Sequence, residues 1–235
     1  MANFNMQIDA TDGSGSFGAY VAKPDTASAP VVIVIQEIFG VSEQMRAVAD
    51  EMAKQGFIAI CPDLFWRQEP GVMLSDKSEA EWEKAFALMN GFDVDKGIED
   101  LQATITAAKS AAGATGKVGT MGFCLGGKMA FLSACRTDAD ANVGYYGVGL
   151  DALLDEASTM KGQLVLHIAE EDGFVDKAAQ EKIHQGLDGQ DNITLYDYPG
   201  VDHAFARPGG VHFDAASALL ANERTYDFFR ATLRN

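Results

Sequence analysis

The chain begins with a segment in which apolar and polar residues alternate around a turn rich in glycine and serine. Residues 3–24, NFNMQIDATDGSGSFGAYVAKP, follow this period of two, which is typical of strands with one buried face. Gly13 and Gly15 provide the conformational freedom that a tight turn needs. The pattern therefore predicts a β-hairpin.

Short, nearly continuous apolar runs follow the hairpin and predict buried strands. Each run is too short for a helix and is bounded by turn residues or by charge. Five such runs are evident, over residues 30–37, 57–65, 117–123, 163–171 and 193–199. Strands that are apolar on both faces are typical of a parallel sheet covered by helices.

Helical patterns separate these strands. The clearest cover residues 42–56, with Ser42 as N-cap and Gly56 as the stop, 78–90, 93–113, closed by Gly113, and 212–234. The alternation predicts an α/β fold with a mostly parallel, twisted sheet flanked by helices on both faces. No repeat or flexible linker divides the chain, so we expect one domain over residues 1–235.

Composition narrows the range of partners. The 235 residues are 47% hydrophobic and 22% charged, with a net charge of −16. Nucleic acid or an anionic membrane would repel such a chain, so neither is expected as a partner. An anionic substrate would need a cationic contact inside the site.

The cellular location of the protein is predicted from the targeting and membrane-spanning patterns that the sequence lacks. The first ten residues have no basic and apolar leader pattern, and the longest apolar run is too short to span a bilayer. Cys61, Cys124 and Cys135 form no Cys-x-x-Cys pair. We therefore expect a cytoplasmic monomer without disulfides.

Cys124 lies in GTMGFCLGGKMAF and allows three interpretations. A free cysteine is most often a small buried apolar residue, and Cys61 and Cys135 fit that role. The stretch GFCLGGKM also matches a phosphate loop, which would make the chain a nucleotide-binding protein, but Met129 stands where a magnesium-binding hydroxyl is needed. The third interpretation is a nucleophile elbow, because Gly122-Phe123-Cys124-Leu125-Gly126 has the G-x-S-x-G frame with cysteine in the centre. The following helix would direct its N–H groups at the sulfur and favour a thiolate.

A cysteine nucleophile needs a base, and His203 is the best candidate among four histidines. It lies in YPGVDHAFARPG, directly after the last predicted strand. By contrast, His167 lies in an apolar strand and His184 in a polar helix, so a core role and a surface role are expected for them. His212 starts the last predicted helix and is expected to cap it or to contact its backbone.

The acid that orients this histidine is expected in HIAEEDGFVD, after the fourth run. Asp172 is favoured because Asp172-Gly173 forms a tight turn at the carboxyl end of a strand, whereas Asp202 is too close to His203 in sequence to face it. Glu37, at the end of the first buried run, is expected to contact the resting thiol. The backbone N–H groups of Leu125 and Ile38 are candidate oxyanion donors.

These motifs together resemble the dienelactone hydrolase family of α/β-hydrolases. The resemblance is carried by QEIFG, CPDLF, GFCLGG, GYYGVGL, EEDGFVD, DHAFAR and ANERTYDFF, in the right order along nearly the whole chain. It implies an α/β-hydrolase fold and a triad of Cys124, His203 and Asp172, with Glu37 as an acid that interacts with the thiol.

The resemblance also implies residues that contact substrate. Arg207 is expected to bind a substrate carboxylate, and Tyr145 in GYYGVGL to line the pocket. Trp82 stands where some members have a second arginine, and Lys84 could compensate for that arginine or the pocket could prefer a more aromatic substrate.

The implied function is a carboxylic ester hydrolase that opens a lactone or enol ester through a thioester on Cys124. Dienelactone, opened to maleylacetate in the catabolism of aromatic hydrocarbons, is the substrate that the resemblance implies. No cofactor or metal is required, and the partner is a small molecule that carries a carboxylate. Alternatives are an aryl esterase or thioesterase on the same fold, a nucleotide-binding protein, and a binding protein without catalysis.

Overall fold

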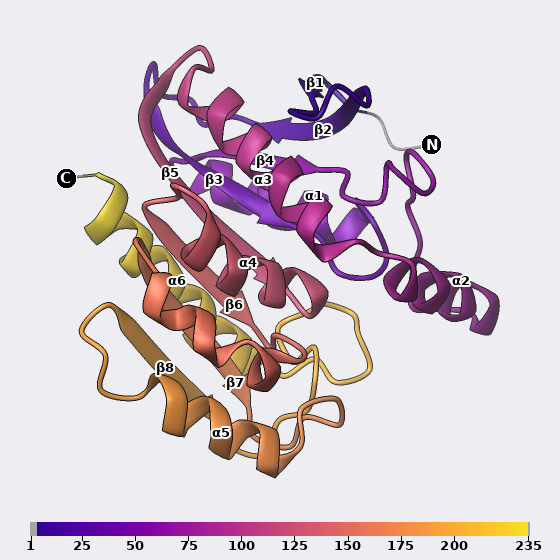
Figure 1. Cartoon of the computed structure of the whole chain (residues 1–235), viewed down its shortest axis with the longest axis vertical. Coiled ribbons are helices and arrows are strands. Elements are labelled where there is room, and N and C mark those ends of the chain that lie inside the picture. The colour runs from indigo at the N-terminus through magenta and orange to yellow at the C-terminus, as the bar shows by residue number, and fades with distance from the viewer. Residues whose placement is uncertain (1–3, 235) are drawn as a thin grey trace. The chain divides into compact units, whose positions relative to one another are not determined.

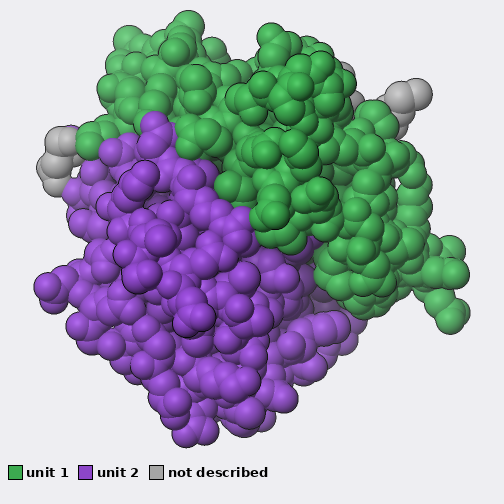
Figure 2. Space-filling model, in the orientation of Figure 1, with its two compact units in different colours: residues 1–119 green, residues 120–235 purple. Residues whose placement is uncertain are grey.

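The computed structural model describes residues 4–234 of the chain. Contacts within it divide the chain into two compact units, one ending at Gly119 and one starting at Thr120 (Figure 2). Asn3, the first residue of the predicted hairpin and part of the segment searched for a leader, lies outside the described residues. Of the helices within residues 4–234, none has both the length and the apolar character needed to span a bilayer.

The first unit is built on strands in the order β1-β2-β4-β3-β5. Their bounds are Met6–Asp9 for β1, Ser16–Ala22 for β2, Ala29–Ile35 for β3, Ile58–Pro62 for β4 and Ala114–Phe123 for β5, which continues into the second unit. β1 and β2 are antiparallel, with Met6 opposite Ala19, which confirms the predicted hairpin. β3 and β4 are parallel, as expected for strands buried on both faces.

Each helix of the first unit begins within one residue of its predicted start. They are α1 (Glu43–Lys54), α2 (Glu79–Asn90) and α3 (Val94–Lys109). Ser42 caps α1 by accepting a hydrogen bond from the N–H of Met45. α3 ends at Lys109, before Gly113, because Gly113 has a φ of 86° and forms the turn into β5. Within this unit α1 and α3 pack on β3 and β4 (Figure 1).

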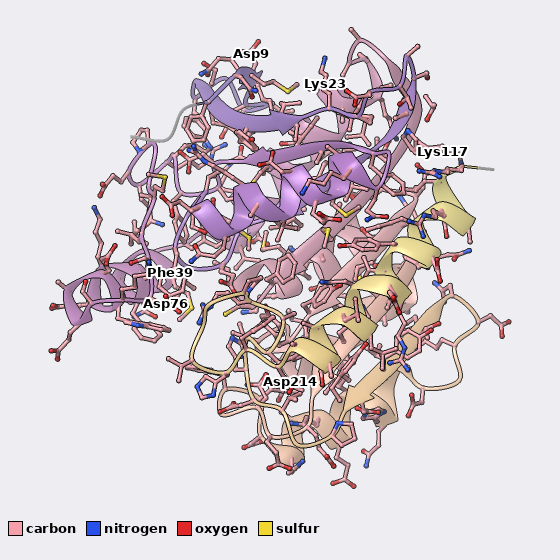
Figure 3. The ribbon with its side chains drawn as sticks, turned by 180° about the vertical axis from the view of Figure 1, so that it is seen from behind. Asp9, Lys23, Phe39, Asp76, Lys117 and Asp214 are labelled. Carbon is pink, nitrogen blue, oxygen red and sulfur yellow. The ribbon has the colours of Figure 1, made fainter. Side chains whose placement is uncertain are left out.

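The second unit contains the end of β5 and three further parallel strands. These are β6 (Ala141–Tyr145), β7 (Gln163–Ala169) and β8 (Ile193–Tyr198), in the order β5-β6-β7-β8. Helices α4 (Leu125–Arg136) and α5 (Lys177–Leu187) cover one face of these strands, and α6 (Ala215–Leu233) covers the other (Figures 1 and 3). The prediction of a mostly parallel sheet with helices on both faces is confirmed.

Two expectations about this unit require correction. β6 was absent from the predicted strands, because Asn142 and Gly144 interrupt the apolar pattern of a strand only five residues long. The side chain of Asn142 is buried, and its oxygen accepts a hydrogen bond from the hydroxyl of Thr120 on β5. His212 does not start α6. Asp214, labelled in Figure 3, is the N-cap and accepts from the N–H of Ser217, while the Nδ1 atom of His212 lies 3.3 Å from an Asp202 oxygen.

A buried polar network connects α6 to the strands of the second unit. The two ring nitrogens of His167 on β7 lie 2.8 Å from the Tyr198 hydroxyl and 2.9 Å from the Thr225 hydroxyl. The Thr225 hydroxyl lies 2.6 Å from that of Tyr145 on β6. His167 is therefore a hydrogen-bonded core residue, as predicted. Burial, together with the charge of Arg224, lowers the pKa of His167 to about 3.

Loss of this neutral buried histidine should change how stability depends on pH. The folded pKa of His167 lies below its unfolded value, so the unfolded chain takes up a proton as pH falls below about 6.5 and the folded chain does not. Between pH 7 and pH 5 this costs about 2 kcal/mol of unfolding free energy. Urea unfolding should show that His167→Gln loses less stability over this interval than the parent does. An equal loss in both proteins would contradict this account.

Candidate active site

Cys124 lies on a sharp turn between β5 and α4. Its backbone has φ 56° and ψ −114°, a conformation that a residue with a side chain rarely adopts. Its N–H donates to the carbonyl of Tyr145 at 3.0 Å, and its own carbonyl accepts from Gly127 N and Lys128 N at 3.0 and 3.2 Å. These bonds fix the turn between β6 and the first turn of α4, so the side chain of Cys124 has a fixed direction.

The glycines around Cys124 are required by close backbone approach. A Cβ atom on Gly122 would lie 2.0 Å from the carbonyl oxygen of Gly126, and one on Gly127 would lie 2.6 Å from that of Tyr145. No side chain fits at either position without moving backbone. The first glycine of the G-x-C-x-G frame and the glycine that follows the frame therefore have a steric origin here. Met129, the residue that weakened the phosphate-loop interpretation, is fully buried in α4.

Cys124 differs from the other two cysteines in exposure. Its side chain is half-buried, whereas Cys61 and Cys135 are buried. Burial, aided by Asp63, raises the pKa of the Cys61 thiol, and burial with Glu156 raises that of Cys135 to about 12. Both therefore stay protonated and apolar, as predicted. Cys124 also precedes the first turn of α4, whose N–H groups have no acceptor within the helix.

His203 and Asp172 are brought together from two loops that follow β8 and β7. The Nδ1 atom of His203 lies 3.0 and 2.9 Å from the two carboxylate oxygens of Asp172. Both side chains are more than nine-tenths buried. This pairing leaves Nε2 of the imidazole for its other neighbour, the thiol of Cys124, with which His203 also hydrogen-bonds.

The charge state of His203 follows from these contacts. Burial lowers its pKa, but the hydrogen bonds and charges of Asp172 and Cys124 outweigh burial and raise the pKa to about 10. These two contacts therefore favour the protonated form of the imidazole. A charged imidazolium next to a cysteine sulfur is the arrangement that activates thiols as nucleophiles.

Asp172 and His203 are held in place by backbone N–H groups and by Asp202. Asp172 Oδ1 accepts from the N–H groups of Phe174 and Val175, at 2.8 and 3.2 Å. Asp202 Oδ1 accepts from the N–H groups of Gly173 and His203, at 2.8 and 2.6 Å. Asp202 is thus not the partner of the imidazole, as predicted, but it ties the two loops together. Sequence reasoning missed this role because the contact joins residues far apart in the chain.

Tyr145 is not placed to contact a substrate. Its side chain is fully buried, and its hydroxyl lies 3.0 Å from Asn222 Oδ1 as well as near Thr225. The expectation from GYYGVGL is therefore corrected: Tyr145 is the last residue of β6 and points into the core toward α6. The neighbouring Tyr146 lies beyond the strand, and its ring contacts the imidazole of His203 at a centroid distance of 5.0 Å.

Arg207 lies four residues after His203 in the same loop. Its N–H donates to the carbonyl of Ala204 at 2.9 Å, which closes a turn directly after the histidine. The residue is 9% exposed, so it is not a surface arginine. Burial of a guanidinium requires polar or charged partners.

Glu37, Ile38 and Trp82 lie in the first unit. Glu37 and Ile38 follow β3 and are buried. The Trp82 ring lies 4.9 Å from that of Phe39, and its indole N–H donates to the carbonyl of Asp76; Figure 3 labels Phe39 and Asp76. Lys84, considered as a replacement for a second arginine, lies half-exposed on α2 and pairs with Glu69 at 2.7 Å.

Comparison with known proteins identifies the class of this chain. The model of the dienelactone hydrolase family matches residues 17–233, and the chain belongs to that family. It is similar to the carboxymethylenebutenolidase of Pseudomonas putida, with 39% identity over 97% of this chain and 96% of that protein. A protein of Azospirillum brasilense, provisionally named for the same activity, is 50% identical over 97% of this chain and 99% of its own length. The family membership makes the chain a hydrolase.

Solved structures agree with this assignment. A crystal structure from Klebsiella pneumoniae, provisionally described as a dienelactone hydrolase, is similar with a TM-score of 0.81 and 25% identity, covering 95% of this chain and 97% of that one. Est1E of Butyrivibrio proteoclasticus has the same fold, with a TM-score of 0.70 at 16% identity over 99% of this chain and all of the other. The α/β-hydrolase fold is confirmed.

Removal of the Asp202 carboxylate should loosen both loops. Asp202→Ala deletes the acceptor shared by the N–H groups of Gly173 and His203, and we expect it to cost about 2 kcal/mol of unfolding free energy. Asp202→Asn keeps an acceptor oxygen at the same place and should recover most of that loss. Thermal and urea unfolding of the two variants measure the difference. Equal stability of the Ala and Asn variants would show that the hydrogen bonds from Gly173 and His203 to Asp202 do not stabilise the two loops.

Proposed function

We propose that this protein hydrolyses a lactone or enol ester by covalent catalysis, with Cys124 as nucleophile, His203 as general acid and base, and Asp172 as the residue that orients His203. The observation that supports the proposal most strongly is the half-buried cysteine on a strained turn beside an imidazole that is itself bound to a buried carboxylate. Dienelactone, with maleylacetate as product, is the substrate that best fits the family.

Acylation begins at the Cys124 sulfur. The thiolate attacks the carbonyl carbon, and the backbone N–H of Leu125, at the start of α4, donates a hydrogen bond to the developing oxyanion. When the tetrahedral intermediate collapses, the ring C–O bond breaks and the leaving oxygen takes the proton of the His203 imidazolium, which leaves a neutral imidazole. The products of this step are the opened chain and a thioester on Cys124.

Deacylation uses the neutral imidazole formed in the first step. His203 removes a proton from a water molecule, whose oxygen attacks the thioester carbonyl. Collapse of the second tetrahedral intermediate breaks the C–S bond, releases the carboxylic acid and restores the thiolate beside an imidazolium. Asp172 stabilises the charge on His203 without accepting its proton.

Arg207 is the proposed contact for a substrate carboxylate. The chain carries a net charge of −16, so an anionic substrate needs a local cation. A guanidinium can bind a carboxylate through two parallel hydrogen bonds, and this one lies in the loop of His203. The roles expected from the sequence for Glu37, Ile38 and Trp82 stay predictions.

Substitution of the nucleophile tests the reaction directly. Cys124→Ala removes the only group that forms the thioester and should lower kcat on an activated lactone by more than about 10⁴-fold, with unchanged thermal unfolding. Brief treatment of the parent with iodoacetamide should label Cys124 in preference to the buried Cys61 and Cys135. An Ala variant with the parent rate would show that Cys124 is not the nucleophile.

Substitution of Arg207 tests the substrate class. Arg207→Gln should raise KM for a lactone that bears a carboxylate by about 10- to 100-fold, because a charge-assisted hydrogen bond is lost. KM for a neutral aryl ester should stay within about twofold. If both substrates are affected equally, the guanidinium does not recognise a carboxylate. If the neutral ester is the better substrate of the parent, an aryl esterase is the better assignment.

A further inference from the structure

The backbone strain of the described residues is concentrated around the imidazole of His203. Within residues 4–234, three residues other than glycine have positive φ: Cys124 at 56°, Tyr146 at 39° and Ala204 at 64°. Cys124 hydrogen-bonds to His203, Tyr146 contacts it, and Ala204 follows it in the chain. Strain of this kind persists only where the surroundings enforce it, and it is frequent at functional sites. The strain at Cys124 belongs to the nucleophile elbow, whereas that at Tyr146 has no role in the reaction described above.

Tyr146 is turned onto His203 by its backbone. Directly after β6 its N–H donates to the carbonyl of His167 on β7 at 2.8 Å, while its φ of 39° directs the side chain away from the path of the strand. The buried ring contacts the imidazole at 5.0 Å with an interplanar angle of 62°, and Phe205 supports it at 5.6 Å. A bulky residue rarely adopts a positive φ, because this backbone conformation is strained. Tyr146 therefore contacts His203 at the expense of a lower-energy backbone conformation.

A second aromatic ring contacts the same imidazole from the loop that carries Asp172. The ring centroid of Phe174 lies 4.7 Å from that of His203, with an interplanar angle of 63°. The N–H of Phe174 donates to Asp172 Oδ1, so one residue supports both members of the pair. Phe174 is 59% exposed, which is unusual for a phenylalanine that merely fills space.

These contacts have a geometry that aromatic groups use for attraction. Inclined rings with centroids 4.5–7 Å apart bring the positive edge of one ring to the negative face of the other. A cation within about 6 Å of a ring centroid is attracted by the same quadrupole. The other groups that act on the imidazole are Asp172, Cys124 and the nearby Asp202. The carboxylates constrain the Nδ1 edge and the backbone, whereas the two rings restrict rotation of the imidazole about its Cβ–Cγ bond.

We propose that Tyr146 and Phe174 are positioning residues that hold the imidazole of His203 between Cys124 and Asp172 and favour its charged form. The inference rests on the proposed function and extends it to two residues that do not take part in bond making. Loss of either ring should lower the rate of steps that need an aligned imidazolium, and substrate binding should change little.

The test compares Phe174→Leu and Tyr146→Leu with the conservative variants Phe174→Tyr and Tyr146→Phe. We expect each Leu variant to lower kcat by roughly 3- to 10-fold, with KM within about twofold, because one aromatic contact is lost. The conservative variants keep a ring and should stay within about twofold of the parent. Phe213→Leu, at an exposed phenylalanine in the loop after Arg207, is the matched control and should behave as the parent does.

Two further measurements distinguish an effect of the Leu substitutions on folding from an effect on the alignment of His203. Phe174 is mostly exposed, so thermal unfolding of Phe174→Leu should match the parent, and its kcat then reports alignment alone. The rate of iodoacetamide reaction at Cys124 at pH 7, followed by mass spectrometry, needs the cysteine–imidazolium pair but no substrate. It should fall by a similar factor in both Leu variants and recover in the conservative ones.

The outcomes distinguish the two proposals. If the parent alkylates Cys124 selectively but hydrolyses neither lactone nor ester, the proposed function fails, and the alkylation rates of the variants still decide the positioning role. Parent-like kcat and alkylation in both Leu variants would overturn the inference. A rise in KM with unchanged kcat would also overturn it, because the rings would then bind substrate.

Discussion

The backbone turn at Cys124 is the constraint on which the second unit depends. β5 can pass into α4 only through a left-handed residue, and that residue is hydrogen-bonded to β6 through the carbonyl of Tyr145. The close approach excludes any side chain at Gly122 and Gly127, so the sequence has little freedom there. In return, the sulfur leaves the strand end in one direction, at the start of a helix whose first N–H groups have no acceptor within it. The same turn therefore fixes the direction of the Cys124 side chain and places its sulfur beside the N–H groups at the start of α4.

The loops that meet this turn are fixed by short polar contacts in addition to buried apolar side chains such as Val175 and Phe205. Asp202 accepts from both loops, Asp172 accepts from its own loop and from His203, and aromatic rings close around the imidazole. In the core of the same unit, the ring of His167 on β7 hydrogen-bonds to Tyr198 on β8 and to Thr225 on α6, and its lowered pKa favours the neutral form. Two histidines of this unit thus have pKa values shifted in opposite directions: carboxylate and thiol partners raise the pKa of His203, and burial lowers that of His167.

The sequence predicted what depends on local pattern and missed what depends on contacts across the chain. Ser42 and the hairpin followed from capping and from period-two alternation. Cys124 was selected by its glycine frame, and Asp172 and His203 were selected because each follows a predicted strand. β6 was missed because a five-residue strand with a buried asparagine has no distinctive pattern. The prediction that Tyr145 lines the pocket was wrong, because its side chain is buried toward α6. The positive φ of Tyr146, whose ring contacts His203, has no signal in the sequence. The hydrogen bonds by which Asp202 connects the two loops, and the contact of Phe174 with His203, have no local signal in the sequence.

Trapping the covalent intermediate tests the central claim most directly. The protein is mixed with a slowly hydrolysed ester, quenched in acid during turnover, digested with trypsin and analysed by mass spectrometry. The account predicts the acyl group on the peptide of residues 118–128, which contains Cys124, and its release by neutral hydroxylamine, as expected for a thioester. Turnover with an unmodified Cys124 peptide and the acyl group on another residue would contradict the account.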